Sequence, residues 1–308
     1  MTAIRQKGTM RQRIELWKHI FETDDNAISK ALSELAWNFA AFSCIVEMVR
    51  AAPNEGAGKQ LNGMILDMIA SGYWSNTMQG VRRLAERGAI NGPRGVCSLG
   101  GLIQDTRAAR GKLTRRVFVE EIAGLAYDYK EVQEQYLQYL LRQSVGVAHW
   151  VPREYHYEPS KQRHALFDWL SGTSSDISTP DDLIREKVFD ALEQRLTRLE
   201  DVVEHVNVQI AHAATEASRR GRVLDQWGLD DAKAALKELS QIAELAGNWF
   251  CYSGIGTVLP TPQFNQFEHL NQPLFAGDMA RLQEVWDAIA AEVSNWHNVE
   301  PSDLLPNE

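Results

Sequence analysis

The stretch that decides the fold is residues 179–220, TPDDLIREKVFDALEQRLTRLEDVVEHVNVQIAHAATEASRR. Its apolar residues recur at alternating spacings of three and four: Phe189, Leu192, Leu196, Leu199, Val203, Val206, Ile210, Ala213 and Ala217. That period keeps them on one side of a helix, as in a helical bundle. A threonine, a proline and two aspartates open the stretch, which is typical of a helix start. The pattern predicts one long bundle helix that ends at Gly221.

The middle of this predicted helix is apolar on more than one side. Within residues 202–214, the side chains that lie off the main stripe include Val202, Val208, Ala211 and Ala214. A helix that is apolar nearly all round is buried nearly all round. The sequence therefore predicts a second partner surface here, which is either another helix or a second subunit.

The rest of the chain also favours helices. Apolar periodicity with start and stop signals predicts helices over about 25–50, 59–86, 102–110, 129–142, 160–170, 230–252 and 277–296, and one that begins after Thr114. Residues 88–101 are rich in glycine and predict a loop. Strand-like alternation is absent, so we expect an all-α helical bundle. It forms a single domain over residues 1–308, with extra helices at both ends.

The composition bounds the class of protein. The chain has 308 residues, of which 44% are hydrophobic, so a sizeable core is expected. No apolar run approaches the ~20 residues that cross a bilayer, and the N-terminus lacks the apolar stretch of a secretory signal. The three cysteines are far apart, which indicates free thiols. These features predict a cytoplasmic protein without a membrane partner, and no motif predicts a metal or another cofactor.

Positive charge is concentrated in one segment, which we call the basic island. Residues 82–116 carry nine basic side chains against two acidic ones, while the whole chain has a net charge of −9. The basic residues are Arg82, Arg83, Arg87, Arg94, Arg107, Arg110, Lys112, Arg115 and Arg116. Arginine suits phosphate because its planar fork binds two oxygens. The island therefore predicts either a phosphate-binding surface or a set of ion pairs with the acidic remainder.

Four polar residues of the long predicted helix share one face. Arg198, His205, His212 and Arg219 follow one another at seven-residue spacing, which is almost two helical turns. Such a column faces solvent, meets acids or lines a polar cleft. For His205, a local pair with Asp201 is the simpler interpretation.

The segment Asn207-Val208-Gln209-Ile210-Ala211-His212 resembles the signature helix of the HEPN superfamily, in particular its abortive-infection-type branch. Two further stretches resemble that branch: Tyr73–Leu84 with the Ser98-Leu99 helix start, and PTPQFNQFEHL at 260–270. The resemblance spans about residues 25–275. It implies a HEPN-like helical core that forms a homodimer through the 202–214 segment.

In active members of that superfamily, paired arginine and histidine side chains make a metal-independent endoribonuclease. The resemblance therefore implies catalytic roles for His212 and Asn207 and RNA as a partner. A histidine can take the proton of the 2′-hydroxyl, and a cation can stabilise the charge that develops on the phosphate. The resemblance also suggests an effector of a toxin or phage-defence system.

The sequence departs from the family motif at one position. The residue before Asn207 is Val206, where the motif has arginine, and Val206 belongs to the apolar stripe. Nucleic-acid contacts would then fall to Arg82, Arg83, Arg198, His205 and Arg219. Two hypotheses follow: a HEPN-like ribonuclease or RNA-binding effector, and a catalytically inactive dimeric scaffold or protein-interaction module.

Overall fold

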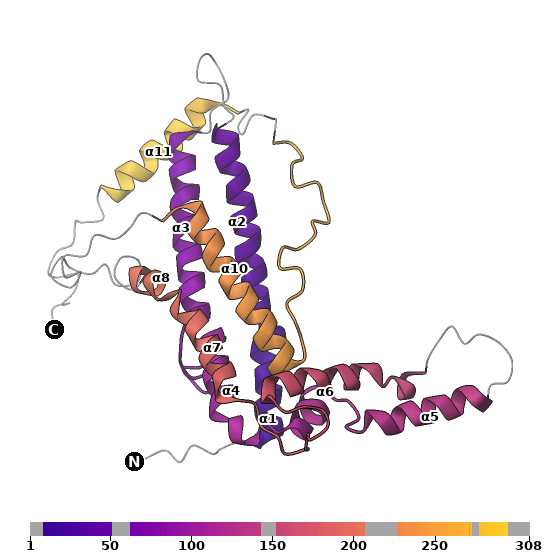
Figure 1. The fold of residues 1–308 in the computed structure, drawn as a ribbon. Coiled ribbons are helices and arrows are strands. Elements are labelled where there is room, and N and C mark those ends of the chain that lie inside the picture. The colour runs from indigo at the N-terminus through magenta and orange to yellow at the C-terminus, as the bar shows by residue number, and fades with distance from the viewer. Residues whose placement is uncertain are drawn as a thin grey trace, which may run out of the picture. The chain divides into compact units, whose positions relative to one another are not determined.

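The structure is a computed structural model that describes residues 9–50, 62–142, 152–206, 227–270, 272 and 277–294 (Figure 1). Throughout these ranges the ordered elements are helices, and the only pairing of extended backbone is an isolated bridge between Thr114 and Leu183. The all-α prediction is therefore confirmed for the part of the chain that is described.

The α-helices are α1 (Met10–Lys18), α2 (Ile28–Arg50), α3 (Gly63–Ala85), α4 (Leu99–Ala108), α5 (Tyr129–Arg142), α6 (Glu158–Ser171), α7 (Glu186–Thr197), α8 (Glu200–His205), α10 (Leu229–Ala246) and α11 (Met279–Val293). The π-helical segments described in full are η1 (His19–Thr23), η3 (Val117–Ile122) and η6 (Gly247–Cys251). Two are 3₁₀ turns: η2 (Arg110–Lys112) and η4 (Arg153–Tyr155).

The chain divides into two compact units, residues 1–260 and 261–308. The boundary falls inside the core that was expected at about 25–275. In the second unit, Asp278 caps α11 by accepting a hydrogen bond from Ala280 N. Leu282, Trp286 and Ile289 are exposed along one side of this helix.

The first unit is built on the long α2–α3 helix pair, with α10 packed against both (Figure 1). The α2 and α3 helices approach closely at Gly80, because a Cβ there would lie only 2.7 Å from Leu35 Cδ2. Helix α10 presents small buried side chains at Ala232, Ala235 and Ala243, which suits close helix packing. It covers the lower part of the pair and also contacts α7.

The three π-helical segments lie close to one another at one end of this unit. Gly247 of η6 has no room for a side chain, because a Cβ would come within 2.7 Å of the ring of Phe21 in η1. The buried Arg163 guanidinium joins η3 to η6 by donating to the carbonyls of Phe118 (3.4 Å), Asn248 (2.6 Å) and Trp249 (2.8 Å). Burial lowers the pKa of Arg163 to about 9, so it stays charged at neutral pH. The contacts satisfy carbonyls that π-helical geometry leaves free.

The single long helix predicted over 179–220 is wrong. Asp182 turns back to accept hydrogen bonds from the backbone and hydroxyl of Thr179, at 2.9 Å and 2.7 Å. Helix α7 begins only at Glu186, and its end is separated from α8 by Leu199, which has a non-helical backbone (φ −97°, ψ 1°). The start signals were present, but they form a turn that pairs with residues 114–116 instead.

Most of the apolar stripe within residues 186–206 is buried, at Phe189, Leu192, Leu196, Leu199 and Val206, but its member Val203 is only partly buried. The remainder of the stripe, in 207–220, lies outside the described residues. The off-stripe Val202 is also buried, since α8 packs against α3. The second partner surface expected for residues 202–214 lies mostly outside the described residues and stays a prediction.

Candidate functional site on the α2–α3 helix pair

The predicted catalytic residues Asn207 and His212 lie outside the described part of the chain, and so do Arg219 and the side chain of His205. Arg198 lies near the end of α7, with its Nη1 3.5 Å from Glu238 Oε1 on α10. Glu238 also pairs with Arg195, whose hydrogen bond lowers the pKa of Glu238. Among the residues described, Arg198 therefore meets an acid rather than a polar cleft.

Much of the basic island forms ion pairs inside the molecule. Arg87 Nε lies 3.0 Å from Glu193 Oε2, and Arg107 Nη2 lies 2.5 Å from Glu186 Oε1 and 2.7 Å from Asp190 Oδ1. All three acids belong to α7. These pairs connect α4 and its flanking turns to α7, so the ion-pair interpretation of the island is confirmed for these arginines.

Arg115 is the most buried cation of the island, with a side chain only 1% exposed. Its Nη2 lies 2.7 Å from Asp168 Oδ1 and 3.1 Å from Asp182 Oδ2, and its guanidinium packs on the Phe167 ring. The contact with Asp168 lacks the alignment of a hydrogen bond, so it is an ion pair only. Arg116 next to it is exposed and lies 3.8 Å from Glu120. Arg115 therefore has a structural role.

Arg82 and Arg83 differ from these paired arginines. Within the described residues neither makes an ion pair, and both line a cavity of about 360 Å³ between α2 and α3. The cavity is lined by Ala31, Glu34, Leu35, Asn76, Gln79, Gly80, Arg82, Arg83 and Glu86. The buried Nε of Arg83 has no hydrogen-bond acceptor among the described residues. Two of the predicted nucleic-acid-binding arginines thus share a cavity wall with two carboxylates.

A thiol, Cys97 in the loop before α4, lies near Arg83 and near Asp24 in the turn before α2. Burial, together with the charge and hydrogen bonding of the Asp24 carboxylate, raises the pKa of the Cys97 thiol to about 11. A backbone hydrogen bond from Asn26 lowers the pKa of Asp24, which also lies 3.2 Å from His19 Nε2. The thiol is therefore protonated at neutral pH, which argues against a nucleophilic cysteine. No cluster of metal-binding side chains is found among the described residues.

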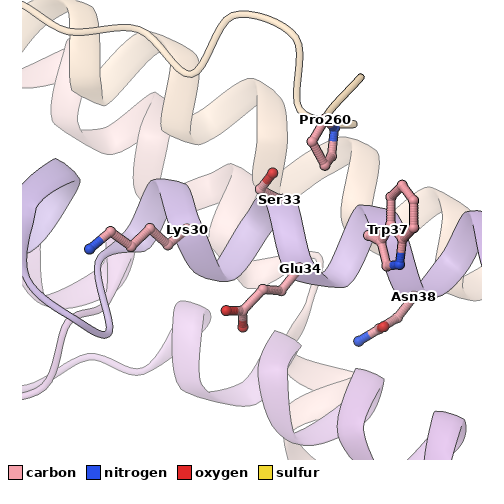
Figure 2. A pocket seen from close by; sticks show the side chains of 6 residues that line it. All are labelled: Lys30, Ser33, Glu34, Trp37, Asn38 and Pro260. Carbon is pink, nitrogen blue, oxygen red and sulfur yellow. The ribbon is translucent and has the colours of Figure 1, made fainter. Parts of the chain in front are cut away.

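A second hollow, of about 420 Å³, runs along another side of α2 (Figure 2). It is lined by Lys30, Ser33, Glu34, Trp37, Asn38 and Pro260. The hydroxyl of Ser33 donates to the Val258 carbonyl at 3.0 Å, which fixes the chain segment that forms the far wall. Glu34 lines both hollows, so α2 places one carboxylate between them.

The far end of the helix pair, residues 45–50 and 63–70, is an apolar surface that we call the apolar end. Four of its side chains are largely exposed: Met48 (40%), Val49 (39%), Met64 (63%) and Met68 (67%). A stacked Phe42–Tyr73 pair, with ring centroids 4.0 Å apart, closes the pair just below it. Exposed apolar patches of this kind mark interaction surfaces.

The stretch from α1 to α2 carries a membrane-like signal. The stretch Met10–Arg50 contains a window of mean hydropathy 1.3, only 17% of which is buried. By length and composition such a window could cross a membrane, but a core helix of a soluble protein passes the same test.

Comparison with known proteins finds no matching family model, curated protein or solved structure.

Sequence reasoning missed the apolar end and the cavity. The apolar end had a signal, because Ile45–Val49 and Met64–Ile69 place apolar residues on every side of their helices. The cavity had none, since it depends on which residues of α2 and α3 face each other.

Proposed function

We propose that the protein is a non-catalytic helical scaffold that self-associates through the apolar end of the α2–α3 pair. The observation that carries this proposal is the exposure of Met48 and Val49 in the last turn of α2 and of Met64 and Met68 in the first turns of α3. Methionine side chains are flexible and polarizable, and they suit surfaces that pack against another protein. This function is the inactive scaffold of the second hypothesis drawn from the sequence, but its dimer interface is the apolar end instead of the 202–214 segment.

The energy available at this surface is sufficient for weak association. The exposed parts of the four side chains amount to roughly two whole apolar side chains. Burying them contributes on the order of 3–6 kcal/mol per copy, and about twice that for a symmetric pair. Association costs about 4–15 kcal/mol in lost freedom of motion. At the favourable limit of these ranges about 8 kcal/mol remains, which corresponds to a dissociation constant in the micromolar range, and the half-buried Ile45, Ile65 and Ile69 add apolar area to the patch.

The charges around the apolar end favour a second copy over a lipid surface. Among the described residues of this end they are Glu47, Arg50 and Asp67, which carry both signs. In a two-fold pair, Arg50 of one copy can face an acid of the other, so the surface is self-complementary. A helix that lies on a membrane needs a rim rich in lysine and arginine. Two acids and one arginine do not provide such a rim.

The absence of catalysis is supported by the surroundings of the motif. Val206, where the resembling family has arginine, is buried in the core and supplies no charge. Arg198 pairs with Glu238, and Arg87 and Arg107 pair with α7. These three arginines are therefore already paired within the same chain, whereas Arg82 and Arg83 form no ion pair among the described residues.

Sedimentation velocity over a range of concentrations tests the proposal. The wild-type protein should dimerise, and the double variant Met64→Glu/Met68→Glu should stay monomeric. The matched control is Leu137→Glu/Leu141→Glu on α5, which also changes two exposed apolar residues and should leave the dimer intact. A wild-type protein that is monomeric at high micromolar concentration contradicts the proposal. Co-sedimentation with neutral lipid vesicles that the Met64/Met68 variant loses would point to a membrane instead.

A ribonuclease or RNA-binding effector is the second candidate function. Arg82 and Arg83 favour it, because neither forms an ion pair within the described ranges, and so does the resemblance around Asn207 and His212. In this version the homodimer forms through the 202–214 segment, and Met64→Glu/Met68→Glu leaves it unchanged. RNA cleavage by the wild-type protein that His212→Ala abolishes would replace the scaffold proposal. If the Val206→Arg variant cleaves RNA and the wild-type protein does not, the wild type would be an inactive HEPN-like protein that lacks its motif arginine.

A further inference from the structure

The cavity between α2 and α3 is a built feature of the helix pair. Leu35 packs where Gly80 has no side chain, so the helices approach closely at the floor. Longer polar side chains surround this point of contact, from Glu34 on α2 and from Asn76 and Gln79 on α3. The volume of about 360 Å³ is at the lower end for small-molecule sites and suits a compact ligand.

Charges of both signs surround the cavity without neutralising one another. Arg82 and Arg83 come from the last turn of α3, Glu86 caps that helix, and Glu34 faces them from α2. Within the described ranges no ion pair joins these four groups, although other arginines of the basic island are paired. The Arg83 Nε is buried without an acceptor, and an unsatisfied buried donor is costly. A ligand that carries both a positive and a negative group would give these charged side chains the partners that they lack.

The arrangement selects for a particular ligand chemistry. A carboxylate can bind the guanidinium groups of Arg82 and Arg83 through charge-assisted hydrogen bonds. A cationic group on the same ligand can meet Glu34 or Glu86. A simple anion is disfavoured, because the two carboxylates and the negative C-terminal end of the α3 dipole oppose it. A nucleic-acid backbone meets the same repulsion.

We propose that the α2–α3 cavity, bounded by Arg82, Arg83, Glu34 and Glu86, binds a small zwitterion of the free α-amino-acid class. The ligand's carboxylate binds the arginines and its ammonium group binds the glutamates. The side-chain amides of Asn76 and Gln79 provide donors and acceptors for the polar atoms that remain. This site lies away from the apolar end, so its occupation does not depend on self-association.

Isothermal titration calorimetry of the full chain with a panel of free L-amino acids tests this proposal. At least one member should bind saturably. Its N-acetyl derivative lacks the cation and its amide derivative lacks the carboxylate, so both should bind at least tenfold more weakly. Inorganic phosphate and a short single-stranded RNA serve as anionic probes and should not compete.

Variants locate the binding. Arg83→Gln and Glu34→Gln should each weaken the best amino acid roughly ten- to hundredfold, as the loss of one charge-assisted contact predicts. Arg82→Gln is a second variant on the same wall, in case Arg83→Gln impairs folding, which circular dichroism would reveal. Arg94→Gln is the control, because Arg94 is exposed and lies outside the cavity.

Three results would overturn the proposal. The first is that no amino acid of the panel binds. The second is equal binding of the parent amino acid and its singly charged derivatives, since one charge would then suffice. The third is displacement by phosphate or RNA, which would identify an anion site.

Discussion

Replacing Arg115 tests the conclusion that the basic island is part of the internal structure. Arg115 and Arg116 are neighbours with the same chemistry and opposite surroundings. Arg115 is 1% exposed and contacts Asp168 and Asp182, whereas Arg116 is 57% exposed and lies 3.8 Å from Glu120. The variants Arg115→Gln and Arg116→Gln therefore form a matched pair.

The expected loss of stability follows from burial. Removing one member of a buried ion pair costs about 3–5 kcal/mol, because the other charge stays buried without compensation. The side chains of Asp168 and Asp182 are 23% and 14% exposed, so water reduces that penalty. We expect Arg115→Gln to lower the free energy of unfolding by about 2–4 kcal/mol. Arg116→Gln should cost less than about 0.5 kcal/mol, as exposed pairs do.

Urea unfolding followed by circular dichroism at neutral pH measures both changes. The midpoint for Arg115→Gln should fall well below that of the wild type, and the midpoint for Arg116→Gln should nearly coincide with it. The reasoning is refuted if the two variants lose the same stability, or if Arg115→Gln loses less than about 1 kcal/mol. In either case Arg115 would not hold the fold, and it would remain available to a phosphate.

The Arg115–Asp182 ion pair also predicts that the effect of Arg115→Gln depends on pH. Burial alone would raise the pKa of Asp182, but hydrogen bonds from Thr179 and Arg115 outweigh burial and lower it below 3.8. A carboxyl whose pKa is lowered in the folded state contributes stability above its unfolded pKa, and loses it as the pH falls through its folded value. The difference between the wild type and Arg115→Gln should therefore shrink as the pH drops below about 4. A difference that stays constant down to that range contradicts this assignment.

Two further predictions concern Gly247 and Cys97. Gly247→Ala should lower the free energy of unfolding by about 1–3 kcal/mol, because the new Cβ would overlap the Phe21 ring. Gly72→Ala has open space around it and should stabilise α3 by about 0.5–1 kcal/mol. Thermal or urea unfolding measures both, and equal effects would argue against close packing of the π-helical segments. Asp24→Asn should lower the pKa of Cys97 from about 11, because the carboxylate that helps to raise it is removed. The thiol should then react faster with iodoacetamide at mildly alkaline pH, which mass spectrometry can follow. An unchanged rate would mean that Asp24 lies too far from the thiol to affect it.

Element type was predictable along most of the chain, because helix signals are local. The helix predicted over 129–142 coincides with α5, and the one predicted over about 25–50 corresponds to α2. The helix start predicted at Thr179 is wrong because a distant contact competes with the local signals. A proline and two acids after a threonine favour a helix start, yet Asp182 binds Thr179 and Arg115 instead. A contact between residues 67 positions apart overrode a local preference.

The candidate site was less predictable than the fold. The sequence singled out Arg82 and Arg83, and the structure places both at a cavity. It also singled out Arg107 and Arg115 as part of the same island, and the structure pairs them with acids that lie far away in the chain. Sequence spacing could not separate these two outcomes, because an arginine's partner is set by which helix packs beside it.

By itself the sequence determined that this protein is helical and which face of α7 and α8 is buried, because a 3.6-residue period is written into consecutive residues. Only the tertiary structure decided which cations are neutralised, where Gly80 lets α2 and α3 approach closely, and that Met64 and Met68 are exposed at the beginning of α3. Each of these depends on distances between residues remote in the chain. Burial and ion pairing are properties of the packed molecule, and no local pattern encodes them.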